Sequence, residues 1–298
     1  MKLKFWGTRG SIPTPGRETV RYGGNTPCLE VRLNNNDLII LDAGTGIRAL
    51  GDQLMATGAS VRAFVAISHP HWDHIQGFPF FKPAFISGNE FTIIGPQPRN
   101  VTLRQMMAHV MNKTYFPIQL HELKANIKFI PMKEGSTKVF DAVLSSLYVN
   151  HPSMALAFRL DAAGRSLVYV SDNEPFDREV AISVKNVDPF VVRKYSESKG
   201  DPNQRLIDFT KDADILIHDA TYTPEEYVNH VGWGHSHYLF CLKIAHEAGV
   251  KKLILSHHDQ GHDDATIDDM LSKCRREIKT RNHKFECLAA AEGLEVEW

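Results

Sequence analysis

Four side chains of the kind that bind metal ions stand within six positions of one another, directly after a short apolar run. The segment reads SHPHWDHIQG, residues 68–77, and the four side chains are His69, His71, Asp73 and His74. The apolar run before it has the length and composition of a buried strand. The four side chains are therefore expected where a strand ends and a loop begins, a common place for functional residues in α/β proteins because the strand holds the loop rigidly.

The spacing His-x-His-x-Asp-His offers two pairs of metal ligands. Imidazole nitrogen and carboxylate oxygen both suit zinc and similar divalent ions. His69 and His71 are expected to serve one site, and Asp73 and His74 a second site nearby. The clustering favours a metal site over four unrelated polar residues in a loop.

The composition is ordinary for a soluble globular protein. The 298 residues include 43% hydrophobic and 23% charged residues, with a formal net charge of −1. That charge argues against a broadly basic nucleic-acid binder, although a local basic groove stays open because net charge does not report distribution.

The N-terminal segment does not resemble a signal peptide, and no apolar run is long enough to span a membrane. A cytoplasmic protein is therefore expected. The four cysteines lie far apart without a CxxC pair and could form two disulfides, but the expected absence of a signal peptide favours free thiols in a reducing cytosol. They are Cys28, Cys241, Cys274 and Cys287.

Short apolar runs predict strands along most of the chain. They lie at 28–33, 37–44, 61–68, 90–96, 126–132, 138–149, 155–162, 165–172, 213–220, 251–258 and 284–298. Apolar residues at helical spacing predict helices at 44–57, 102–111, 236–249 and 265–279. Ser236 is expected to cap the third helix and Gly249 to end it.

The alternation of these elements predicts sheets with helices packed outside them. The polar stretch 193–204 is expected to be a surface loop. Because neither a low-complexity linker nor a repeat interrupts the sequence, we expect a single domain over residues 1–298.

The segment from His69 to His74 resembles the signature of the metallo-β-lactamase fold superfamily. The resemblance implies an α/β fold, a four-layer αββα sandwich, with a metal site along one edge of its two sheets. It extends over most of the chain, and 176–212 matches least well. The family supplies further ligands after later strands, and the residues at those positions are His151, Asp172 and His257.

In the family pattern one ion is held by His69, His71 and His151 and a second by Asp73, His74 and His257, with Asp172 bridging the two. His258 is the alternative to His257, and Asp219 is the rival bridge. Asp42, in the segment LDAGTG, is expected to support the metal loop. Two zinc ions are implied, with manganese and iron as alternatives because the same ligands accept them.

Two glycine-rich segments, FWGTRGSIPTPG (5–16) and YGGNTPCLEV (22–31), resemble the opening of the ribonuclease Z branch and its small-phosphodiesterase relatives. The glycines would permit tight turns and a close ligand approach. Arg9 and Asn25 are then candidates for binding an anionic substrate. The alternative is an ordinary hairpin-rich start without a ligand.

The segments ILIHDATYTPEEY (215–227) and GWGHSHYLF (232–240) resemble a further ribonuclease Z pairing. The resemblance implies that His235 donates a proton to the leaving oxygen, with Asp219 or His218 orienting it. A helix N-terminus at His235 would also suit a phosphate. The alternative makes His235 a capping or surface residue. Asp73 completes the expected catalytic set.

The resemblance favours hydrolysis over redox chemistry, since the flavodiiron branch has a glutamate where His71 stands. Secreted β-lactamases of the commonest type have a cysteine at Asp172, and lactonases of this fold have a tyrosine at Pro175. The favoured function is a dinuclear-metal-dependent phosphodiesterase, in which a metal-bridging hydroxide attacks a small or cyclic phosphodiester.

Several alternatives stay open. They are a ribonuclease Z-like RNA endonuclease, an ester, thioester or lactone hydrolase, and a non-catalytic metal-containing sensor. Nucleic acid is disfavoured as a partner for two reasons. Ribonuclease Z grips transfer RNA with a long glycine-rich arm, and this chain shows no clear equivalent of it. The chain is also near neutral, whereas contacts to phosphates drive RNA affinity. The segments 78–85 and 227–240 are candidates for closing the pocket or for forming a homodimer contact.

Overall fold

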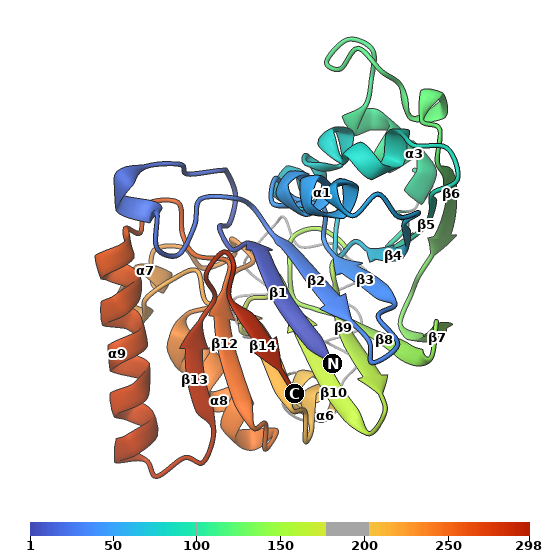
Figure 1. Cartoon of the computed structure of the whole chain (residues 1–298). Coiled ribbons are helices and arrows are strands. Elements are labelled where there is room, and N and C mark those ends of the chain that lie inside the picture. The colour runs from blue at the N-terminus through green and yellow to red at the C-terminus, as the bar shows by residue number, and fades with distance from the viewer. Residues whose placement is uncertain (99, 177–202) are drawn as a thin grey trace. The chain divides into compact units, whose positions relative to one another are not determined.

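The computed structural model describes residues 1–98, 100–176 and 203–298 and divides into two compact units. Unit 1 comprises Met1–Lys133 and Ala291–Trp298, and unit 2 comprises Glu134–Ala290. Each unit contains one seven-stranded mixed sheet together with helices (Figure 1). This division into units does not test the expectation of a single domain, which stays a prediction.

The sheet of unit 1 has the order β14-β1-β2-β3-β4-β5-β6. Neighbours from β14 to β3 pair antiparallel, and those from β3 to β6 pair parallel. The strands are β1 (Lys2–Gly7), β2 (Cys28–Arg32), β3 (Leu38–Leu41), β4 (Arg62–Ala66), β5 (Glu90–Gly95), β6 (Asn126–Pro131) and β14 (Glu295–Glu297). The α-helices are α1 (Ile47–Ala56), α2 (Trp72–Ile75) and α3 (Leu103–Val110), and the 3-10 helices are η1 (Arg17–Thr19), η2 (Phe78–Phe80), η3 (Lys82–Phe85) and η4 (Leu120–Glu122).

The core of unit 1 forms where the parallel strands are buried. All four residues of β3, which pairs antiparallel with β2 and parallel with β4, are buried. Ile47, Leu50 and Leu54 form the buried face of α1 and belong to the same hydrophobic cluster as Ile40 on β3. This packing holds the ends of β3 and β4, from which the loops of the candidate site begin.

The sheet of unit 2 has the order β13-β12-β11-β10-β9-β8-β7. Neighbours from β7 to β10 pair antiparallel, and those from β10 to β13 pair parallel. The strands are β7 (Gly135–Val139), β8 (Ala142–Tyr148), β9 (Leu156–Ala162), β10 (Arg165–Val170), β11 (Ile215–Asp219), β12 (Lys252–Ser256) and β13 (Glu286–Ala289). The α-helices in the described part are α6 (Gln204–Thr210), α7 (Pro224–Tyr227), α8 (Tyr238–Glu247) and α9 (Asp264–Thr280).

The two sheets therefore repeat one pairing pattern, three antiparallel pairings followed by three parallel ones, although the sequence shows no repeat. Parallel strands place their carboxyl ends at a common edge, where α/β sheets carry their sites. In each unit the predicted site residues follow mainly the parallel strands.

Most predicted elements are confirmed, with differences at turns. The run 138–149 is two strands, because the chain reverses at Phe140, whose φ is 51°. The run 284–298 also divides, because β13 belongs to unit 2 whereas β14 pairs with β1 (Figure 1). The apolar runs did not predict β1 as a strand.

The predicted cap of α8 is wrong. His237 occupies the N-cap position, and the Ser236 hydroxyl donates instead to the Asn173 carbonyl at 2.5 Å. Gly249 does end the helical segment, with a φ of 66°.

The structure bears on three further expectations. The four cysteines are buried and form no disulfide, as predicted. No helix in the described ranges combines the length and apolarity that crossing a bilayer requires. Residues 193–202 of the predicted surface loop lie outside the described residues.

The turn between β9 and β10 generates a stability prediction. Ala163 and Gly164 connect the strands as a two-residue loop, with φ values of 50° and 73°. This is the backbone of a type I′ turn, which favours Asn-Gly because alanine is strained at positive φ. We expect Ala163→Asn to raise the free energy of unfolding by roughly 0.5–1 kcal/mol, measured by urea denaturation.

The matched control is Ala59→Asn, at another exposed loop alanine that does not have a positive φ. It should bring no such gain. Equal effects at both positions would show that the turn geometry is not the cause.

Candidate functional site

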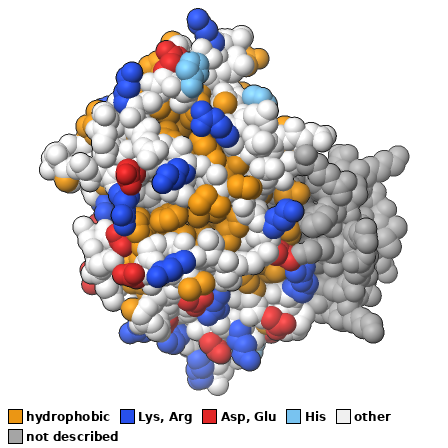
Figure 2. Space-filling model, turned by 90° about the vertical axis from the view of Figure 1, so that its right-hand side faces the viewer, with side chains coloured by type: hydrophobic (Ala, Val, Ile, Leu, Met, Phe, Trp, Pro, Cys, Tyr) orange, Lys and Arg blue, Asp and Glu red, His pale blue; other side chains and the backbone are white. Residues whose placement is uncertain are grey.

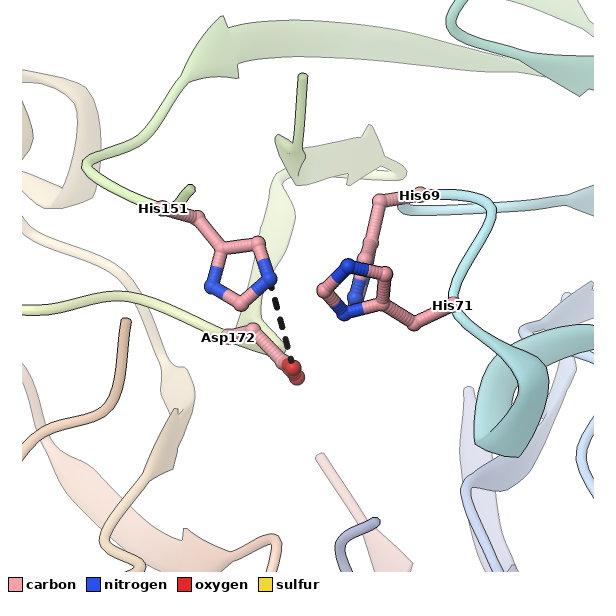
Figure 3. Close-up of side chains that lie close together, drawn as sticks. All are labelled: His69, His71, His151 and Asp172. Carbon is pink, nitrogen blue, oxygen red and sulfur yellow. Dashed lines mark ion pairs between the residues drawn. The ribbon is translucent and has the colours of Figure 1, made fainter. Parts of the chain in front are cut away.

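The unit 1 part of the site is the loop between β4 and α2 together with α2 itself. His69, Asp73 and His74 are buried, whereas His71 is exposed. Figure 3 shows His69 and His71 extending from this loop, with ring centroids 4.5 Å apart. The ligand atoms of His69 and His71 lie within 4.8 Å of each other, as do those of Asp73 and His74. The ring centroids of His69 and His74 are also close, 4.2 Å apart, so the division into two pairs stays a prediction.

Asp42 organises this loop from the end of β3. Its carboxylate accepts hydrogen bonds from the Ser68 backbone N–H at 2.7 Å and the Ser68 hydroxyl at 2.9 Å. His74 Nδ1 lies 2.8 Å from Asp42 Oδ2, and since a carboxylate only accepts, Nδ1 carries the proton. Asp42 has a φ of 61°, a left-handed conformation that costs energy in a residue with a side chain. This is the supporting role expected of Asp42.

Asp73 is held from a different segment of unit 1. The Ser11 backbone N–H donates to Asp73 Oδ2 at 2.8 Å, and His74 Nε2 lies 3.2 Å from the same oxygen. The glycine-rich first turn, which contains Ser11, thereby helps to position a predicted ligand.

In unit 2, the Asp172 carboxylate lies near the rings of three histidines, His151, His235 and His257. It follows β10, His257 follows β12, and His151 lies between β8 and β9. Asp172 Oδ1 is 3.2 Å from His257 Nε2, and Asp172 Oδ2 is 4.0 Å from His151 Nε2, the ion pair drawn in Figure 3. Asp172 Oδ2 also lies 3.9 Å from His235 Nδ1, so Oδ1 faces one ring nitrogen and Oδ2 faces two.

The other ring nitrogen of each histidine has a fixed partner. His151 Nδ1 donates to the Gly234 carbonyl at 3.0 Å, and His257 Nδ1 lies 3.1 Å from the Thr221 hydroxyl. Gly234 has a φ of 89°, and a Cβ there would lie 2.2 Å from His151 Nδ1, so only glycine fits. Such partners fix the tautomer and make Nε2 the ligand atom.

The geometry distinguishes His257 from His258. His257 faces Asp172, and its φ of 59° is again left-handed. His258 Nε2 instead lies 2.9 Å from the Ala290 carbonyl, away from the other candidate ligands. This arrangement favours His257 as the ligand.

Asp219 is surrounded by donors of its own chain. Its carboxylate is fully buried and accepts five hydrogen bonds. The donors are the backbone N–H groups of Asn173, Thr221 and Ser236, the Thr221 hydroxyl and His235 Nδ1. Burial raises the pKa of this carboxyl, but the charge and hydrogen bond of His235 lower it below its ordinary value. Because its acceptor positions are taken, Asp219 suits orientation better than bridging.

His235 lies at hydrogen-bond distance from Asp219, 3.1 Å from Nδ1 to Oδ2, as the expected orienting pair requires. The alternative partner, His218, is buried and donates its Nδ1 proton to the Asp219 backbone carbonyl at 2.7 Å. His235 precedes the first residue of α8 by three positions, so the expectation of a helix N-terminus at His235 is wrong.

Arg9 and Asn25, the expected substrate-binding residues, have structural contacts. Arg9 is fully buried, and its Nε donates to the Gly23 carbonyl at 2.8 Å. Asn25 donates to Glu292 at 3.0 Å and accepts from the Thr45 hydroxyl at 3.0 Å. These contacts hold the first turn and give no support to a substrate role.

Glu174 is a residue that the sequence analysis missed. It is buried and accepts hydrogen bonds from the backbone N–H groups of Gly232 at 2.6 Å and Gly234 at 2.9 Å. Gly234 in turn accepts from His151 and directly precedes His235, so Glu174 positions both. The only local signal was a carboxylate two residues after Asp172, and its partners lie about sixty residues further along the chain.

The contacts of Glu174 generate a prediction. Glu174→Gln keeps the side-chain size but turns an amide N–H₂ toward a backbone N–H, which displaces the loop that carries His235. Outer contacts of this kind are worth about 10–100-fold in activity or metal affinity. We expect kcat/KM to fall by that factor, measured beside the metal content of the same sample.

Glu225→Gln is the matched control, since Glu225 is an exposed carboxylate of α7 in the same region. It should leave kcat/KM unchanged. If Glu174→Gln also leaves kcat/KM unchanged, Glu174 does not position His151 and His235.

Comparison with known proteins identifies the family of the chain. The model of the β-lactamase superfamily domain matches residues 38–199, more than half of the chain. A ribonuclease Z from Myxococcus xanthus is 29% identical and covers 94% of this chain and 93% of its own length.

Two solved structures share the fold. The metallo-β-lactamase fold protein YhfI from Bacillus subtilis has a TM-score of 0.68 at 18% identity, covering 100% of this chain and 99% of its own. A diphosphatase from the PhnP family has a TM-score of 0.62 at 15% identity, covering 100% and 97%. They confirm the predicted fold class, two mixed sheets with flanking helices in the αββα arrangement of the family. The chain therefore belongs to the β-lactamase superfamily, in the ribonuclease Z and phosphodiesterase branch of the metallo-β-lactamase fold, and is a metal-dependent hydrolase.

Proposed function

We propose that this hydrolase is a phosphodiesterase that uses two divalent metal ions to cleave a small or cyclic phosphodiester. The observation that carries the proposal is the position of Asp172, whose two oxygens approach Nε2 of His151 and Nε2 of His257 separately. A carboxylate with one oxygen toward each of two histidines is suited to a pair of ions.

The chemistry of the donors fits such ions. Imidazole and carboxylate ligands suit zinc, and manganese or iron would be accepted by the same set. We assign one ion to His69, His71 and His151 and the other to Asp73, His74 and His257, with Asp172 shared. This assignment rests on the order of the motifs along the chain, on the family, and on the fixed Nδ1 partners within each unit.

Two ions held by these residues would supply a water-derived nucleophile at neutral pH and stabilise charge on phosphoryl oxygens. The chain's own contribution is the control of a proton at His235. Asp219 accepts from Nδ1 of His235 and so orients the ring, leaving Nε2 as the nitrogen that would carry the proton to the leaving oxygen.

A ribonuclease Z-like activity on RNA is the second candidate. The Myxococcus xanthus relative of that name aligns over 94% of the chain, which weakens the expectation that nucleic acid is not a partner. A net charge of −1 favours the smaller substrate, because release of counterions from phosphates drives RNA affinity.

Metal removal combined with substrate choice tests the proposal. We expect the metal-loaded protein to hydrolyse bis(p-nitrophenyl) phosphate and a cyclic nucleotide, to lose both activities after chelation, and to regain them with zinc. We expect His71→Ala to abolish turnover and lower the metal content, measured by elemental analysis.

His121→Ala is the matched control, since His121 is an exposed histidine of unit 1 outside the loop. Cleavage of a transfer-RNA precursor at rates matching those for the cyclic nucleotide would support the second candidate instead. Two metals per chain with turnover of esters alone would point to ester or thioester hydrolysis.

The role of His235 is tested by the leaving group. Loss of a general acid costs about 10²–10⁴-fold in rate when the leaving oxygen must be protonated. We expect His235→Ala to lower kcat by that factor for a cyclic nucleotide but far less for bis(p-nitrophenyl) phosphate, because p-nitrophenolate departs unprotonated. The metal content should stay at the level of the unmodified protein.

His246→Ala, at an exposed histidine of α8, is the control and should behave as the unmodified protein. Equal losses on both substrates would contradict the proton-donor role. Loss of metal in His235→Ala would make His235 a ligand, as its place beside Asp219 and His257 also permits.

A further inference from the structure

Unit 1 contains an apolar pocket beside the metal loop. Its volume is about 580 Å³, within the range of small-molecule sites. Its walls include four aromatic side chains and two polar ones, Trp72, Phe80, Tyr115, Phe116, Gln76 and His109. Among the described residues, no Asp, Glu, Lys or Arg lines it.

Several residues that line the pocket are direct sequence neighbours of the predicted metal ligands. Pro70 and Trp72, which line the pocket, stand on either side of His71. The short helix α2 carries Asp73 and His74, while its Trp72 and Ile75 line the pocket. A molecule held in the pocket would therefore contact the same loop that supplies the ligands.

The aromatic side chains are unusually accessible for their size. Trp72 is 77% exposed, Phe80 55% and Tyr115 83%. Phe80 packs edge-on against Phe116, with ring centroids 5.3 Å apart, so the wall has a defined shape. Figure 2, which views the side of Figure 1 where α3 and β6 lie, shows hydrophobic side chains gathered on that face.

The side chains that line the pocket determine which chemical group it can bind. A phosphate would find no cation among the described lining residues, so the charged part of a substrate does not belong here. A planar uncharged ring can stack on the exposed aromatic faces, while the Gln76 amide and the His109 ring offer hydrogen bonds at its edge.

We propose that this pocket binds the uncharged aromatic group, such as a nucleobase, of the phosphodiester that the metal centre cleaves. The inference rests on the proposed phosphodiesterase function and narrows its substrate to esters that carry a planar ring. A ribose phosphate without a base would use the metal ligands alone.

The test compares binding of adenosine 5′-monophosphate and ribose 5-phosphate to the metal-loaded full chain by calorimetry. The two probes share the phosphate and the ribose and differ in the base. We expect the base-bearing probe to bind about five- to twentyfold more tightly, the factor that stacking on exposed aromatics provides. Tyr115→Ala and Phe80→Ala should each remove most of this difference without affecting ribose 5-phosphate.

Ile130→Ala is the control, because Ile130 is an exposed apolar side chain of unit 1, on β6, outside the pocket lining. It should leave both affinities unchanged. Equal affinity of the two probes, or a preference for the base that survives both aromatic substitutions, overturns the inference.

Binding is measured without turnover, so the outcome is separate from that of the proposed function. A base preference that depends on Tyr115 and Phe80 supports the pocket even in a protein that cleaves no diester. A concentration-dependent dimer that Tyr115→Ala and Phe80→Ala dissociate would assign these side chains to a contact between copies and overturn the inference.

Discussion

The buried carboxylate of Asp219 is the constraint on which the unit 2 site depends. Its five hydrogen bonds come from the segments that follow β10 and β11 and from the loop that enters α8. A buried carboxylate is stable only when donors replace its hydration, so these segments are held in one arrangement. Thr221 extends the arrangement, because its hydroxyl lies beside both Asp219 and His257. Glu174 adds a second carboxylate that holds the glycines before His235.

Unit 1 also contains a buried carboxylate that accepts hydrogen bonds from neighbouring segments. Asp42, at the end of β3, fixes Ser68 and His74 after β4, just as Asp219, at the end of β11, fixes Thr221 and His235. In both units a carboxylate at the end of a parallel strand receives donors from neighbouring segments. The proposed metal ligands are therefore oriented by backbone and carboxylate contacts of the chain itself, which would reduce the reorganisation that metal binding requires.

The sequence predicted the fold class, most strands and helices and the ligand loop, because these depend on local patterns: apolar runs, helical spacing and the His-x-His-x-Asp-His cluster. It failed where the outcome depends on distant partners. The run 284–298 looks continuous, yet its two halves join different sheets. Arg9 and Asn25 stay predicted substrate-binding residues, and their hydrogen bonds to Gly23, Thr45 and Glu292 could not be read from the sequence. Glu174 could not be recognised, since its partners are about sixty residues away.

The left-handed backbone at Asp42 and His257 has a consequence for how this chain can change. Both residues keep a conformation that glycine or asparagine would adopt with less strain. Relief of backbone strain alone would therefore favour replacing them, but each replacement would remove either a proposed ligand or the buried carboxylate that holds Ser68 and His74. Backbone strain and the proposed metal binding oppose each other at these two positions. An engineered thermostable form should hold both fixed and take its gains from turns remote from the strand ends.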